Sequence, residues 1–342
     1  MHIILNKELR KKLSNSLRKF RKSNKGNPNQ LKLKDIDTIS EVIISSRKEA
    51  NIEISKDIRK ELEIAYLCVH SISLLALLFS DRRKNNILPQ DYFDKYNVPS
   101  VNLLVGNILT LISNHSLSII QLLENGMDWS SRPILRTLSE LSALFIVILA
   151  IPEKAKIYMN PQNEQEERII WFKNFTPNKL KKLLIQIKEE DKIEGETIEL
   201  FNELFEHLHS FYTQTTHTAS IVSIVGAFSS GKRETLNYAL WGRYSLSIES
   251  RLLDLTHIIF FTTEIFLSIL DKYYQITLSN EKYFAALFNS IYDCLLGMIK
   301  DFTKKMLKDN STDCVYTIDI FLRFWDLGHR EKYSFSKIFY RE

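Results

Sequence analysis

Residues 128–151 read DWSSRPILRTLSELSALFIVILAI, and the rest of the chain is interpreted around this stretch. Leucine and isoleucine recur in it every three or four positions, which predicts a helix with one side in a hydrophobic core. Because proline suits the first turn of a helix, Pro133 indicates that the helix begins at Ser130 or Ser131. The sequence continues to the next proline at position 152, so we expect the helix to end near Ile151.

Three charged residues follow one another along this helix at intervals of four: Arg132, Arg136 and Glu140. That spacing places a guanidinium and a carboxylate on one face, with a second guanidinium one turn earlier. In so apolar a helix, charges are usually paired, because an unpaired buried charge costs several kcal/mol. The pair could be an internal ion pair that fixes the register of the helix, a functional group in a polar cleft, or a feature of the exposed surface.

A second segment, residues 203–220, carries His207, His209 and His217 between apolar positions. We expect a helix over residues 197–213. Positions 207 and 209 point about 200° apart on a helix and cannot share a metal ion, whereas positions 209 and 217 share a face. We therefore expect no metal site and no cofactor. The histidines are interpreted either as a general acid or base or as hydrogen-bonded structural groups. For a catalytic role His217 is the main candidate, with His209 and Thr213 as secondary candidates.

The composition predicts an all-α protein. The chain has 342 residues, 44% of them hydrophobic, with only 9 glycines and 7 prolines. Long runs of Leu, Ile, Lys and Glu between so few turn-forming residues favour long helices over a sheet of many strands. We expect an antiparallel multi-helix bundle. Three widely separated cysteines, at positions 68, 294 and 314, indicate packing rather than a disulfide framework or a zinc site.

No transmembrane segment is expected from the sequence. The longest apolar runs are residues 65–79, 142–151 and 255–270, and none reaches the roughly 18 to 20 uninterrupted apolar residues taken as the requirement for a bilayer span. The first dozen residues are charged and lack the apolar segment of a secretory signal. These observations predict a cytoplasmic protein whose apolar runs are buried core helices.

Residues 1–34 form a basic arm, and residues 35–342 are expected to form a single large helical domain. The arm carries eleven Lys and Arg and one Glu, a net charge of +10, whereas the whole chain has +5. Its leucines recur at helical spacing, which predicts an amphipathic helix with a cationic side. Such an arm suits nucleic acid or another anionic surface, although a solvated tail would have the same composition. We expect it to hold phosphates through Lys11, Lys12, Arg18, Lys19, Arg21 and Lys22.

Residues 226–232, GAFSSGK, match the first seven positions of a phosphate-binding P-loop. The motif requires a Ser or Thr at the next position to hold Mg²⁺, and that position is Arg233. The parallel sheet that carries such a loop is also missing from the expected elements. We therefore interpret this segment as a turn between helices.

Two short segments resemble the signatures of an uncharacterised group of helical bacterial proteins related to the HEPN superfamily. Residues 131–141, SRPILRTLSEL, contain its Arg, three residues, Glu pattern, and residues 208–217, LHSFYTQTTH, contain its Thr four residues before a His. The similarity covers about residues 101–270. It implies a HEPN-like antiparallel helix bundle, a homodimer and, as in HEPN relatives, metal-independent RNA cleavage in toxin, antiviral or RNA-processing systems.

The usual HEPN motif is an Arg, then four to six residues, then a His, and here no Arg or Lys occupies the six positions before His217. Arg136 would instead supply the cation from the neighbouring helix. His217 would act as acid or base for attack by a ribose 2′-hydroxyl. Glu140 would orient Arg136, and Arg132 would neutralise phosphate.

Three functions remain open from the sequence. The first is a HEPN-like defence or toxin effector that binds or cleaves RNA or nucleotides, presumed homo-oligomeric from the resemblance. The second is a non-catalytic module that docks a partner protein and uses the same polar residues as a buried structural network. The third is peripheral membrane association through the basic amphipathic arm.

Overall fold

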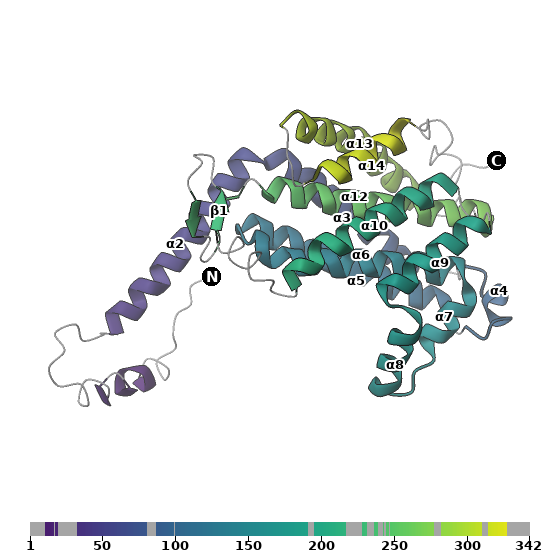
Figure 1. The fold of residues 1–342 in the computed structure, drawn as a ribbon, viewed down its shortest axis with the longest axis horizontal. Helices are drawn as coiled ribbons and strands as arrows, with labels where there is room; N and C mark the ends of the chain where they lie inside the picture. Colours follow the sequence, from purple (N-terminus) through teal and green to yellow (C-terminus); the bar gives the residue numbers. More distant parts are fainter. Residues whose placement is uncertain are drawn as a thin grey trace.

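The computed structural model describes residues 11–16, 18–19, 33–80, 87–98, 100–190, 195–216, 228–230, 236–238, 242, 244–245, 247–276, 282–309 and 314–326. Apart from one short hairpin, the described part of the protein is an all-α, multi-helix bundle, as the composition predicted (Figure 1). Its helices are α2 (Leu33–Asp57), α3 (Arg59–Ser80), α4 (Gln90–Asp94), α5 (Val101–Glu124), α6 (Asp128–Ala150), α7 (Pro152–Met159), α8 (Glu164–Asn174), α9 (Pro177–Glu189), α10 (Gly195–Thr216), α12 (Ser247–Ser268, continued by a π-helical turn, Ile269–Tyr273), α13 (Lys282–Lys308) and α14 (Val315–Asp326).

Helix α12 is the central element of the bundle. Every residue from Ser250 to Ser268 is buried, which is the pattern of a helix surrounded on all sides. Helices α3, α6 and α10 run beside it, and α13 and α14 cover it from the other side (Figure 1). The bundle is therefore built around a helix that has no face left for solvent over most of its length.

The turn between α5 and α6 makes those two helices antiparallel. Gly126, with φ of 69°, ends α5 as the sequence predicted, because a left-handed residue after the last turn lets the chain reverse. The amide of Gly126 donates to the carbonyl of Leu123 at 2.9 Å. Gly242, with φ of 96°, packs against this turn so closely that a Cβ there would lie 2.0 Å from the carbonyl oxygen of Asn125.

Two local predictions differ from the structure. Ser100 immediately precedes α5 as expected, but its side chain makes no capping hydrogen bond. Instead the side-chain oxygen of Gln90 accepts from the amide of Val101 at 3.2 Å. In the segment interpreted as a turn between helices, the described part is a short hairpin: β1 (Phe228–Ser230) pairs antiparallel with β2 (Leu236–Tyr238).

The expectation of no transmembrane segment is wrong. Four helices, α3, α5, α6 and α12 with its π-helical turn, are long and apolar enough to cross a membrane, judged by length and composition. The sequence argument demanded an uninterrupted apolar run, but a span tolerates serine, threonine and histidine if charged residues are few. Residues 64–80 and 101–123 contain no Asp, Glu, Lys or Arg at all. In each of these helices an apolar segment of 18 residues could cross a membrane. That segment is 100% buried inside the protein in α12 but only 50% buried in α5, so α5 presents an uncharged face outward.

Candidate functional site

The polar line predicted on α6 faces α10. The Nε of Arg136 donates to Oε1 of Glu140 at 2.9 Å, one helical turn away. The Nδ1 of His209, on α10, lies 3.0 Å from the same carboxylate oxygen. The side chains of the three residues are 21%, 17% and 24% exposed, respectively. A cation, a carboxylate and an imidazole therefore meet where α6 and α10 pack, within reach of solvent.

Glu140 is ionised in this arrangement. Burial by itself raises the pKa of its carboxyl, but His209 and Arg136 together lower that pKa below its usual value. A carboxylate beside Nδ1 favours the imidazole tautomer that carries its proton on Nδ1, which leaves Nε2 as the nitrogen that exchanges protons. Among the described residues, Nη1 and Nη2 of Arg136 make no hydrogen bond, because the bond to Glu140 uses Nε.

A second, deeper cluster lies beside the first, with Arg251 of α12 at its centre. Nη1 of Arg251 donates to the hydroxyl of Tyr212 at 2.6 Å and lies 3.1 Å from Oδ2 of Asp254. The Tyr212 hydroxyl in turn donates to Asp254, and the hydroxyl of Thr317 donates to the other oxygen of that carboxylate at 2.9 Å. All four residues are buried, so α10, α12 and α14 share one internal polar network.

Asp128, in the first turn of α6, links Arg132 of that helix to the Arg251 cluster. Its Oδ2 accepts from Nη2 of Arg132 at 2.7 Å and from the hydroxyl of Ser247 at 2.8 Å. Its Oδ1 lies 3.6 Å from Nε of Arg251. The guanidinium of Arg132 also stacks over the ring of Trp129, 4.7 Å from its centroid. The α6 face with Arg132 and the buried centre of α12 are thus electrostatically continuous.

Asp128 and Arg251 hold each other ionised, whereas burial outweighs Arg251 at Asp254 and raises the pKa of that carboxyl. Burial raises the pKa of the Asp128 carboxyl, but Arg132 and Arg251 outweigh burial and lower that pKa. Burial likewise lowers the pKa of Arg251, but Tyr212 and Asp254 raise it above its usual value. An ion pair of this kind is worth little by itself, but removal of one partner leaves the other as an uncompensated buried charge.

The remaining predicted site residues are placed as follows. His217, Arg21 and Lys22 lie outside the residues that the structure describes. Thr213 is next to the site, but its hydroxyl donates to the carbonyl of His209 at 2.5 Å. The other four basic residues of the arm are exposed on helical turns: Lys11, Lys12, Arg18 and Lys19.

His207 and His209 face different neighbours, as their spacing predicted. The ring of His207 stacks on Tyr316 of α14 with centroids 4.5 Å apart, whereas His209 faces α6. Over the described residues, no group of three His, Cys, Asp or Glu could hold a metal ion.

Sequence reasoning missed the Arg251 cluster and the linking role of Asp128. A signal was available, because Arg251, Asp254, His257 and Glu264 interrupt an otherwise apolar helix, and charges in such a helix need partners. The partners themselves come from elsewhere in the chain and carry no local pattern.

Comparison with known proteins identifies no relative of this chain. No family model matches the chain, and neither the curated proteins nor the solved structures contain a match. The interpretation of the site therefore depends on its own geometry.

Proposed function

We propose that this chain binds RNA or a nucleotide through the α6 face that carries Arg132 and Arg136, and that it cleaves RNA there without a metal ion. The HEPN-like resemblance and a role as a defence or toxin effector belong to the same proposal. The observation that supports it best is the contact of Arg136 and His209 with one Glu140 oxygen, at 2.9 and 3.0 Å. In metal-independent phosphodiester cleavage an imidazole can move the proton of the attacking hydroxyl, and a fixed cation can stabilise the charge that develops on the phosphate.

The proposed reaction starts from a ribose 2′-hydroxyl. Nε2 of His209 accepts the hydroxyl proton, and the 2′ oxygen attacks the adjacent phosphorus. The bond from phosphorus to the 2′ oxygen forms while the bond to the 5′ oxygen breaks, and the leaving oxygen takes a proton from solvent or from a second histidine. The products are a 2′,3′-cyclic phosphate and a 5′-hydroxyl. His217, the histidine first selected from sequence, remains a candidate for that second proton transfer.

Arg136 would act on the phosphate. Its two terminal nitrogens form the fork that matches phosphate oxygens, and they are not used in the bond to Glu140. Glu140 would position both Arg136 and His209 rather than touch the substrate. The exposed cations of the basic arm, such as Lys11 and Arg18, would hold further phosphates without reading sequence.

His209→Ala and Arg136→Ala test this proposal in the purified full chain, with end-labelled single-stranded RNA as substrate. We expect His209→Ala to slow cleavage by about a hundredfold or more, since a positioned acid or base contributes about 10² to 10⁴. Arg136→Ala should weaken RNA binding and reduce its dependence on salt. The matched control is His207→Ala, two positions away and directed at α14, which should cleave at the wild-type rate. His217→Ala, tested in parallel, shows whether the second histidine takes part.

A specific observation favours a second candidate function, a non-catalytic module that docks a partner protein. The Arg251 cluster is fully buried and internally hydrogen-bonded, as expected of a network that fixes packing. Under that function the wild-type chain leaves RNA intact, does not bind it, and loses thermal stability when Arg136 is replaced. That set of results would overturn the nuclease proposal.

A further inference from the structure

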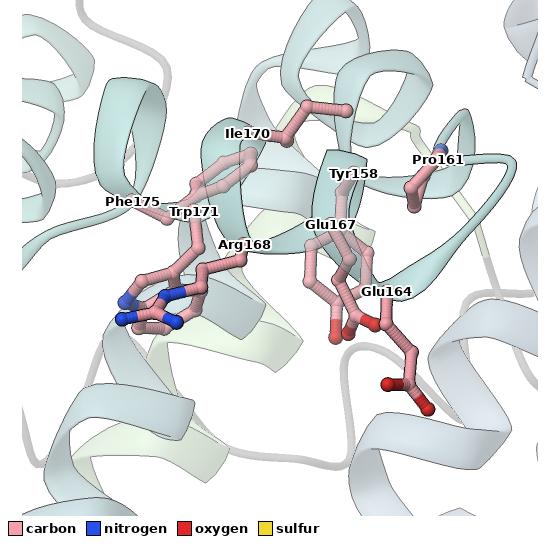
Figure 2. Close-up of a pocket in the computed structure, with 8 residues that line it drawn as sticks. All are labelled: Tyr158, Pro161, Glu164, Glu167, Arg168, Ile170, Trp171 and Phe175. Atoms are coloured by element: carbon pink, nitrogen blue, oxygen red, sulfur yellow. The ribbon is translucent and has the colours of Figure 1, made fainter.

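Away from the α6 and α10 contact, helices α7 and α8 enclose a pocket of about 350 Å³. Figure 2 shows six side chains that define its chemistry: Tyr158, Glu164, Glu167, Arg168, Trp171 and Phe175. Its volume is at the lower end of the range for small-ligand sites, about 300 to 1,000 Å³. The pocket belongs to a part of the chain that projects from the bundle below α9 (Figure 1), so it is separate from the candidate site described above.

Three aromatic rings form the apolar part of this pocket. Phe175 is fully buried and belongs to the lining. The Tyr158 ring meets Phe175 edge-on, with centroids 5.7 Å apart and planes at 84°, and the Trp171 centroid lies 6.2 Å from that of Phe175. Aromatic faces carry partial negative charge and attract cations that come within about 6 Å of the ring centroid.

Two carboxylates add to that preference. Glu164 and Glu167 line the pocket, and in Figure 2 both carboxylates lie on the opposite side of the view from the guanidinium of Arg168. Burial raises the pKa of Tyr158, and the negative charge of Glu167 raises that pKa further. The carboxylate of Glu167 therefore acts electrostatically on the Tyr158 side chain. Arg168 places its guanidinium over Phe172, 5.8 Å from the ring centroid. Phe172 does not line the pocket. Arg168, the cationic residue of the lining, is therefore held partly by an aromatic ring outside the pocket.

We propose that this pocket binds an organic cation, specifically an alkylated ammonium group, against Trp171 and Tyr158. Its methyl groups would replace water on the aromatic faces, and its charge would be balanced by Glu164 and Glu167. A small, strongly hydrated cation gains little from such rings, because it must lose its water to reach them. The proposal is independent of RNA binding, because neither Arg136 nor His209 lies in or near the lining.

Tetramethylammonium chloride is the probe, titrated into the full chain at constant ionic strength with sodium chloride as the matched salt. We expect a saturable change in tryptophan fluorescence with tetramethylammonium and none with sodium. In Trp171→Ala the apparent affinity should fall about tenfold or more, which is within the usual strength of a cation held by an aromatic face. Trp171→Phe, which keeps a ring, should retain part of the affinity when binding is followed by calorimetry.

Three substitutions at exposed positions, two of them combined, guard against a variant that simply unfolds. Glu164→Gln and Glu167→Gln together should weaken binding and remove most of its salt dependence, whereas Arg168→Gln should strengthen it. Helix content by circular dichroism should be unchanged in all three. Absence of saturable binding to the wild-type chain, or wild-type affinity in the Glu164→Gln, Glu167→Gln double variant, would overturn the proposal.

Discussion

The guanidinium of Arg251 is enclosed by two carboxylates and a phenol, with Asp254 and Asp128 at 3.1 and 3.6 Å. Asp254→Ala removes the carboxylate that accepts from Arg251, Tyr212 and Thr317 at once. We expect a loss of about 3 to 5 kcal/mol in the free energy of unfolding, because the cation stays buried with too little counter-charge. Urea titration of the purified chain measures this loss.

Glu63→Ala is the matched control for that prediction. Glu63 also pairs with an arginine, Arg59, at 2.8 Å, but both side chains are more than half exposed. Exposed pairs at this spacing contribute about 0.3 to 0.5 kcal/mol, so this variant should unfold at nearly the wild-type urea concentration. Equal losses in the two variants would contradict the assignment of Arg251 as a charge held in the core.

His257 makes stability depend on pH. Burial lowers the pKa of its imidazole from 6.5 to about 3. The Thr303 hydroxyl donates to the Ile299 carbonyl at 2.8 Å, so Nε2 of His257 must be the donor in its 3.1 Å contact with Thr303. Protonation would then fall on Nδ1, which has no hydrogen-bond partner among the described residues.

Below pH 6.5 the imidazole of His257 is therefore protonated in the unfolded chain, but it stays neutral in the folded chain down to about pH 3. Stability should be unaffected by this group above pH 6.5 and should fall as the pH decreases from 6.5 towards 3, by at most about 1.4 kcal/mol per pH unit. His257→Gln, which cannot titrate, should flatten the decline between pH 7 and pH 5, measured by urea titration at each pH. That window excludes the carboxyls of Asp128 and Glu140, whose lowered pKa values make them titrate at lower pH. Parallel curves for wild type and variant would refute the assignment.

At the scale of the elements, the chain enters α12 through a contact that only glycine permits. Gly242 has φ of 96°, and a Cβ there would lie 2.0 Å from the Asn125 carbonyl oxygen. Gly242→Ala should destabilise the fold by about 1 to 3 kcal/mol, because it forces a strained backbone and displaces the α5 to α6 turn that carries Asp128. Thermal unfolding followed by circular dichroism measures this effect.

Gly297 provides the opposite case on α13. A Cβ at that position would meet nothing within 4 Å. Gly297→Ala should therefore stabilise the protein by about 0.4 to 1 kcal/mol, since alanine restricts the unfolded chain and suits a helix interior. Destabilisation by both substitutions would mean that the contact with Asn125 is not what makes Gly242 necessary.

The helices were predictable where their signals are local. Both ends of α5, Val101–Glu124, lie at local signals, with Ser100 before the helix and Gly126 shortly after it. The start of α6 was predicted two or three residues late, because Pro133 was assigned to the first turn and Asp128 instead begins the helix. Among the described helices, α3 and α5 are long and apolar enough to cross a membrane, which the sequence prediction denied. Their signal is a long segment without charged residues and not an unbroken apolar run.

The candidate site was predictable only in part. The four-residue spacing of Arg136 and Glu140 already implies their pairing. Helical spacing alone would place positions 209 and 217 on one face, and the sequence favoured His217. The contact of His209 with Glu140 depends on how α10 is positioned along α6, which no local pattern encodes. Tyr212 and Thr317 lie 39 and 63 positions from their polar partners on α12, and no local pattern encodes a contact at that separation.

Across the whole molecule, local stability should differ most between α8 and α12. No residue of α8 is buried, whereas α12 is buried along almost its entire length. The first turn of α8 is held by a side-chain cap, in which Asn163 accepts from the Glu166 amide at 2.9 Å, and by Glu166, which accepts from the Gln162 amide at 2.9 Å. Hydrogen exchange followed by mass spectrometry should show α8 exchanging through local opening and α12 only through global unfolding.

Asn163→Ala distinguishes local opening of α8 from global unfolding. Loss of the cap should speed exchange of α8 by about fivefold, the equivalent of about 1 kcal/mol, and leave α12 unchanged, because α8 has no fully buried residue and packs mainly on α7. Asn163→Asp, which can still cap, should leave both helices as in the wild type. Asp254→Ala should instead speed hydrogen exchange in α12, since it lowers the stability of the whole bundle. Equal acceleration of α8 and α12 by Asn163→Ala would mean that the projecting helices and the bundle unfold as a single unit.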